Sequence, residues 1–236
     1  VSTLTLLSGF RLIHKIIYRP LSIREVELFY FFLMFLGDMF LYYNRKGFDR
    51  KDKINNIIGI MKKLDTKRLY VGGILGTICA LLYGLSFYHL VLACQEKFVS
   101  FAWILFLINT LGIIFGGAYH IQFAYLGLLS RHEGKEAFDE FFKFLKFQAK
   151  LVFGIMGLGN LGLSIMILFG LTIFPRWQVL LTPLVLVTLT PLIGKLPRGL
   201  HMIIGGGWFN LIYFILFTTC LYLLIFIEKY RVSIYN

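Results

Sequence analysis

The chain has 236 residues, of which 58% are hydrophobic and only 15% are charged, and its mean hydropathy is +0.77. Soluble domains carry about a quarter charged residues, whereas the charges here flank uncharged apolar runs of the roughly 20 residues that cross about 30 Å of hydrocarbon. The formal net charge is +12, but the basic residues gather between those runs, where anionic lipid headgroups are the expected partner. The composition therefore predicts an all-α, polytopic transmembrane helical bundle that forms one integral membrane domain, and it argues against a nucleic-acid-binding protein.

Apolar run length and flanking charge predict about six spans, preceded by an amphipathic interfacial segment at residues 1–20. The expected spans cover residues 24–43, 70–94, 99–126, 149–174, 178–194 and 199–227. A tight turn at Pro175, Arg176 and Trp177 is expected to join the fourth and fifth spans. The fifth span should end before Lys195.

The segments 44–69 and 130–148 are expected to be basic cytoplasmic loops that contain amphipathic helices. Residues 54–64 place apolar side chains at helical spacing among lysines, which is typical of a helix on the membrane surface. Phe138, Phe141, Phe142 and Leu145 repeat this pattern between acidic and basic turns.

Counting Lys and Arg on the two sides of the spans predicts the topology. The side that holds 44–69 and 130–150 is about twice as rich in basic residues as the other, so we expect it to be cytoplasmic and both termini to be outside. The basic amphipathic pattern of residues 4–18 favours the opposite orientation, because such helices are drawn to the anionic cytoplasmic leaflet.

Asp38 is the most informative polar residue, because it lies about five residues from the end of the first span, where a carboxylate must be paired, hydrogen-bonded, protonated or hydrated. At 1.5 Å per residue, Asp38 lies about 6 Å and His120 about 10 Å from the middle of their spans, on the same side. We therefore expect the two side chains to meet if their helices are neighbours.

Stripes of small and polar residues indicate which helix faces point inward. Asn109, Gly112, Gly116 and His120 form the first stripe, on the third span. Gly157, Asn160 and Ser164 form the second, and Gly206, Gly207 and Asn210 the third, where three consecutive glycines are expected to loosen the helix.

These faces are expected to converge on one cytoplasm-facing polar cavity. Its predicted ligand-binding residues are Asp38, His120, Asn160, Asn210 and His201, the last at the rim. The competing interpretation is structural, because buried Asp, His and Asn also serve as interhelical hydrogen bonds worth about 1 kcal/mol each.

Asp38, Ser86, His89, His120 and His201 superficially resemble the site residues of the seven-helix zinc hydrolases of the alkaline ceramidase and adiponectin receptor type. An Asp with two His can hold zinc and leave a position open for water. However, Ser86 and His89 form SxxH rather than SxxxH, the last span has no paired HxxxH, and the chain has one span too few. The resemblance therefore assigns no residue roles.

The sequence favours the binding or transport of a small molecule or lipid through this cavity. An intramembrane lipid-modifying hydrolase, with or without a metal, is the alternative. The second alternative is an accessory subunit whose 25 Phe and 13 Tyr contact a membrane-protein partner or a second copy of the chain. The short loops and the GD pair in the first span are similar to those of small bacterial membrane proteins, which implies a bacterial inner (plasma) membrane as the location.

Overall fold

The computed structural model describes residues 32–43, 53–132 and 134–235, and this part of the chain is an all-α bundle without a strand. The predicted interfacial segment 1–20 and the first part of the span 24–43 lie outside the described residues. Four segments are long and apolar enough to cross a membrane: Thr66–Ala93, Glu96–His132, Lys135–Leu168 and Trp208–Phe226. Two shorter apolar helical stretches, Phe32–Tyr42 and Pro183–Ile193, stand where the first and fifth of the expected spans were placed.

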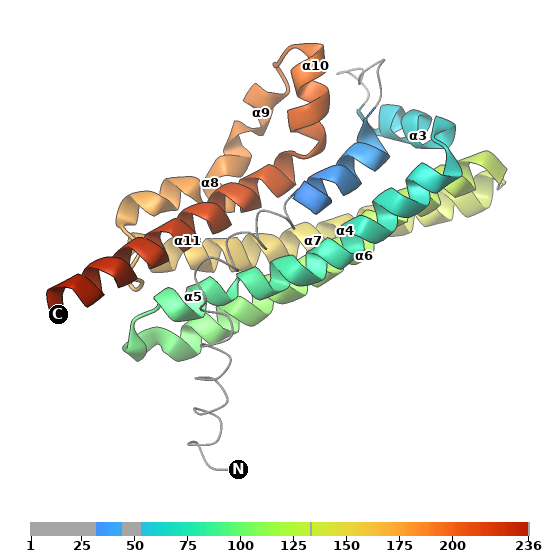
Figure 1. Ribbon diagram of the computed structural model, residues 1–236. Helices are drawn as coiled ribbons and strands as arrows, with labels where there is room; N and C mark the ends of the chain where they lie inside the picture. Colours follow the sequence, from blue (N-terminus) through green and yellow to red (C-terminus); the bar gives the residue numbers. More distant parts are fainter. Residues whose placement is uncertain (1–31, 44–52, 133, 236) are drawn as a thin grey trace.

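Three long helices run side by side along the bundle (Figure 1): α4 (Thr66–Ser86), α6 (Val99–His132) and α7 (Lys135–Leu168). Small residues let α4 and α6 approach closely, because a Cβ added at Gly84 would lie 3.0 Å from a Thr110 methyl group. Thr77 Oγ1 donates to the Gly117 carbonyl oxygen at 3.0 Å across the same interface. Leu81, Leu107 and Leu158 are each about 60% exposed on the outside of these helices, a surface that suits lipid.

The segment 130–148 is not a loop, so that prediction was wrong, although the helix expected at 138–145 is present as part of a longer one. Helix α6 continues to His132, and α7 begins at Lys135 and runs without a break to Leu168. At 1.5 Å per residue, each of these 34-residue helices is about 51 Å long, well beyond about 30 Å of hydrocarbon. The charged turns of 135–150 are therefore the first turns of α7 itself, which continues without a break into the apolar part of the helix.

The predicted amphipathic helix within 44–69 is present as α3 (Lys53–Lys63). Its apolar face packs against the end of the bundle, with Met61 and Leu64 buried against Leu69 and Ala124. Arg131 holds the end of α3 in place, because its guanidinium donates to the carbonyl oxygens of Lys62, Met61 and Leu64 and to Thr66 Oγ1. Figure 1 places α3, the α6–α7 turn and α10 at one end of the bundle, and α5 and the C-terminus at the other.

The opposite end of the bundle is closed by two turns that pair with each other. Helix α5 (Tyr88–Ala93) and the short helix η1 (Glu96–Phe98) lead into α6. The backbones of Cys94 and Thr172 pair in a single antiparallel β-bridge. The fourth span ends at Leu168 rather than 174, because Gly170 adopts φ +68° and Leu171 N–H donates to the Met166 carbonyl oxygen at 2.8 Å. This left-handed glycine ends the helix, so the turn precedes the predicted one at Pro175.

The fifth span, expected over 178–194, is broken into short pieces. They are η2 (Arg176–Leu181), α8 (Pro183–Leu186), η3 (Val187–Leu189) and α9 (Thr190–Ile193). Pro183 and Pro191 remove backbone donors and clash with a preceding turn, so no continuous helix forms. The prediction of a regular helix here was wrong.

The sixth span is interrupted at its glycines, as expected. Helix α10 (Arg198–Leu200) continues as the π-helix η4 (His201–Gly205), and α11 (Trp208–Tyr235) begins after Gly207. Figure 1 shows the chain changing direction sharply between α10 and α11. The Phe32–Tyr42 helix packs against this bend, because a Cβ added at Gly206 would lie 3.5 Å from the Tyr42 Cβ.

Candidate functional site

A cavity of about 310 Å³ lies where the Phe32–Tyr42 helix, α4, α6, α7, η4 and α11 meet. Its size is at the lower end of the range for small-molecule sites. The Phe32–Tyr42 helix presents Met34, Asp38 and Tyr42 to the cavity at intervals of four residues, which places them on one helical face. Helix α11 contributes Asn210 and Tyr213 just after the glycine bend. The bend therefore shapes the cavity and orients its polar wall.

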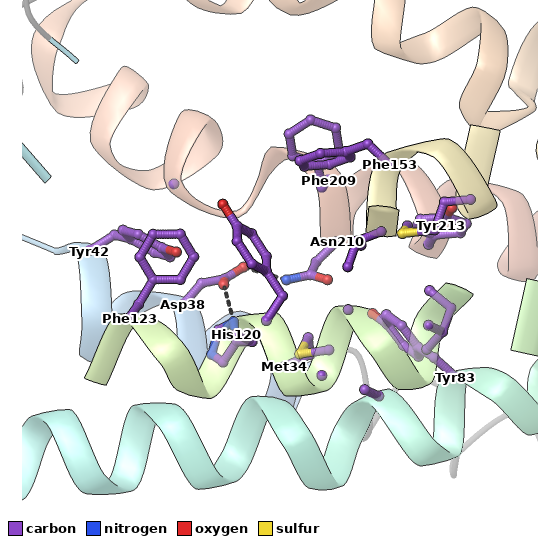
Figure 2. Close-up of a pocket in the computed structure, with 18 of the residues that line it drawn as sticks. Met34, Asp38, Tyr42, Tyr83, His120, Phe123, Phe153, Phe209, Asn210 and Tyr213 are labelled. Carbon is purple, nitrogen blue, oxygen red and sulfur yellow. Dashed lines mark hydrogen bonds and ion pairs between the residues drawn. The ribbon is translucent and has the colours of Figure 1, made fainter. Parts of the chain in front are cut away.

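Asp38 is the polar centre of this wall and is only 4% exposed. Asn210 Nδ2 donates a hydrogen bond to Asp38 Oδ2, and Asp38 Oδ1 lies 3.8 Å from His120 Nδ1 (Figure 2). Arg68 ends the Phe32–Tyr42 helix by donating to the carbonyl oxygens of Met39, Phe40 and Tyr43 at 2.9–3.1 Å. The carboxylate is thus held on a short helix that is capped at one end and packed on the glycine bend.

The orientation of His120 is set from the other side. Its Nε2 lies 3.0 Å from the Gly72 carbonyl oxygen, and because a carbonyl only accepts, Nε2 must carry the proton of this bond. The imidazole lies directly over Gly76, where an added Cβ would collide with the ring. Gly76 therefore leaves room for the ring, and Nδ1 is turned toward Asp38.

Asp38 and His120 can hold one proton between them, either on the carboxyl group or as the second N–H of the imidazole. The separation of 3.8 Å between Oδ1 and Nδ1 exceeds hydrogen-bond length. Asp38 and His120 both line the cavity. The arrangement can therefore accept a hydrogen-bond donor or a cation at Oδ1, and it can exchange a proton.

Asp38, His120, Asn210 and His201, four of the five side chains expected to share a cavity, do line the same one. Asn160 is placed elsewhere: its Nδ2 donates to the Met156 carbonyl oxygen at 2.8 Å and to the Tyr213 hydroxyl at 2.7 Å. It therefore reaches the cavity only through Tyr213. Gly157 does not face inward either, since an added Cβ there would meet nothing within 4 Å.

Several cavity residues were missed at the sequence level. The Tyr83 hydroxyl is buried and has no hydrogen-bond partner among the described residues, and Tyr83 lines the cavity. Six more aromatic side chains line it: Tyr42, Tyr119, Phe123, Phe153, Phe209 and Tyr213. A chain with 38 Phe and Tyr residues offers no signal that singles these out.

The combination of Asp38 with two histidines as a zinc site has no support in the described part of the chain. No group of three His, Cys, Asp or Glu side chains there is arranged to hold a metal ion. His89 lies on α5, at the other end of the bundle from α3, and does not line the cavity.

Fold and cavity together define a class: an all-α helical bundle, with helices long and apolar enough to cross a membrane, that holds a largely apolar cavity with Asp38, His120 and Asn210 on its wall. The chain belongs to a family of unknown function (DUF6796), whose model matches residues 28–226 and so covers the whole cavity. No curated protein and no solved structure matches it.

Proposed function

We propose that this protein is a multi-pass membrane protein that binds or carries a small molecule or lipid in the cavity around Asp38 and His120. The observation that carries the proposal is the convergence of Asp38, His120 and Asn210 from three separate helices on one cavity of about 310 Å³. Burying polar side chains in an apolar bundle costs free energy. Asp38, His120 and Asn210 line a space that a ligand can fill.

The location we propose is a bacterial inner membrane, with the end that carries α3 and the α6–α7 turn in the cytoplasm. The concentration of Lys and Arg in residues 44–69 and 130–150 supports this orientation. The glycine bend beside Asp38 supports a carrier, because a broken helix is a place where a bundle can open and close around a site.

Native mass spectrometry of the full chain, released from a mild detergent, tests the proposal. We expect a retained small molecule or lipid in the wild type. In the Gly116→Leu variant, the new side chain projects into the cavity, while its Cβ lies at an ordinary 3.8 Å from Val152 Cγ1. This variant should lose the retained molecule.

Gly154→Leu is the matched control, because an added Cβ at Gly154 meets nothing within 4 Å and both changes give the helix the same gain in propensity. Equal retention in the two leucine variants would contradict the cavity as the binding site. A stoichiometric metal that is lost on Asp38→Asn substitution would favour the hydrolase alternative. A chain that retains only a protein partner would favour the accessory subunit.

A further inference from the structure

The charges of the cavity restrict the ligand. Asp38 is the one acidic side chain among the described residues that line the cavity, and no Lys or Arg is among them. A desolvated anion would meet a carboxylate and no Lys or Arg side chain, which is unfavourable. The cavity is therefore poorly suited to a phosphate or carboxylate group.

The aromatic side chains of the cavity form a continuous series, which we call the aromatic arc: Tyr42, Phe123, Tyr119, Phe153 and Phe209. Successive ring centroids along it are separated by 5.7, 5.0, 6.3 and 5.4 Å. The arc starts on the Phe32–Tyr42 helix and crosses α6 and α7 to α11. In Figure 2, Tyr42 and Phe123 lie on one side of Asp38, while Phe153 and Phe209 lie across the cavity from His120.

Aromatic faces carry negative potential, and several of them around a carboxylate form the environment that attracts an organic cation. The buried Asp38 accepts a hydrogen bond from Asn210 on Oδ2, while Oδ1 lies 3.8 Å from His120 Nδ1, beyond hydrogen-bond length, and the residue lines the cavity. A positively charged ligand group there would offset the cost of burying the carboxylate.

We infer that the ligand of this cavity is a small organic cation, an amine or quaternary ammonium compound, whose charge lies at Asp38 and whose apolar part lies against the aromatic arc. This inference rests on the proposed function and names its substrate class. The rival reading is that a protonated His120 supplies the counter-charge, in which case the cavity favours a neutral ligand.

Three probes of nearly the same shape separate these readings: choline, its neutral isostere 3,3-dimethylbutan-1-ol, and the anion 3,3-dimethylbutanoate. Binding of each to the full chain in detergent is measured by isothermal titration calorimetry, with micelles alone as the blank. We expect choline to bind at least tenfold more tightly than the alcohol and the anion not to bind. Phe123→Leu, in the arc, should weaken choline about two- to fivefold.

Asp38→Asn should weaken choline about 10- to 100-fold, because the quaternary ammonium group loses its Coulombic attraction to a buried carboxylate. The new amide oxygen can still accept from Asn210, so this variant keeps the contact that anchors the helix. Asp139→Asn is the charge-matched control, because Asp139 is exposed on α7 outside the cavity. It should bind choline like the wild type.

Equal affinity for choline and the alcohol, or an unchanged choline affinity in Asp38→Asn, would overturn the cation assignment. If Gly116→Leu then still abolishes binding of the alcohol, the cavity remains the site and the proposed function stands. If none of the three probes binds, the cation assignment falls. The proposed function falls with it only if native mass spectrometry also finds no retained molecule.

Discussion

Replacing Gly76 by alanine tests the packing that orients His120. A Cβ at this position would collide with the imidazole ring, mainly with Cδ2 and Nε2. The ring cannot move away without giving up the 3.0 Å hydrogen bond from Nε2 to the Gly72 carbonyl oxygen. A single methyl group should therefore displace the histidine that faces Asp38.

The expected decrease in the free energy of unfolding has two parts. Overpacking a well-filled interior costs about 1–3 kcal/mol, and loss of one buried hydrogen bond costs about 1 kcal/mol. Every Gly→Ala change inside a helix also gains roughly 1 kcal/mol of helix propensity, so the effect is best read against a second Gly→Ala variant. Gly154→Ala serves this purpose because its Cβ meets nothing within 4 Å. We expect the free energy of unfolding of Gly76→Ala to be about 2–4 kcal/mol below that of Gly154→Ala.

Unfolding of both variants by sodium dodecyl sulfate in mixed micelles, followed by circular dichroism, measures this difference. Diethyl pyrocarbonate modification, quantified on the peptide that contains His120, reports whether the ring has moved. It should be faster in Gly76→Ala, because the wild-type His120 side chain is only 12% exposed. If the two alanine variants unfold within about 0.5 kcal/mol of each other and His120 reacts at the wild-type rate, the argument from steric collision is refuted.

Three further predictions follow from other contacts. Cysteines at Tyr42 and Gly206, in a background without the native cysteines, should form a disulfide on mild oxidation, because a Cβ at Gly206 would lie 3.5 Å from the Tyr42 Cβ; a chain that stays reduced on a non-reducing gel would show that the first helix does not pack on the bend. Arg131→Lys should lower the free energy of unfolding by about 1–3 kcal/mol, since an ammonium cannot make the forked contacts to the end of α3; a denaturation curve that matches the wild type would refute this. Asn160→Leu should cost about 1 kcal/mol of stability and change choline affinity less than twofold, because Asn160 does not line the cavity; a larger loss in calorimetry would make it a ligand contact.

Several features of the fold were predictable because they depend on neighbours along the chain. The apolar runs and the segregated charges indicated the long helices and the amphipathic helix now seen as α3. The three glycines from Gly205 to Gly207 indicated the interruption before α11. The distances of Asp38 and His120 from the middles of their spans indicated that the two side chains would meet if their helices were neighbours. In the structure the side chains do approach each other.

Other features were missed or misjudged, and each miss has a physical cause. Hydropathy marks where a span meets water but not whether the helix continues, so the charged turns at the start of α7 were taken for a loop. Pro183 and Pro191 outweighed the apolar character of 178–194 and broke the expected fifth helix. Asn160 was assigned to the cavity from spacing, yet the rotation of α7 turns it toward Tyr213.

The sequence by itself determined the all-α class of this protein and its four long apolar helices, because apolar length and charge placement act locally along the chain. Only the tertiary structure decided which side chains share the cavity. Tyr83 and the aromatic arc come from five different helices, and their position depends on how those helices pair and rotate. Glycines such as Gly76 set this pairing through contacts between residues 44 positions apart in the sequence, as the collision with His120 shows.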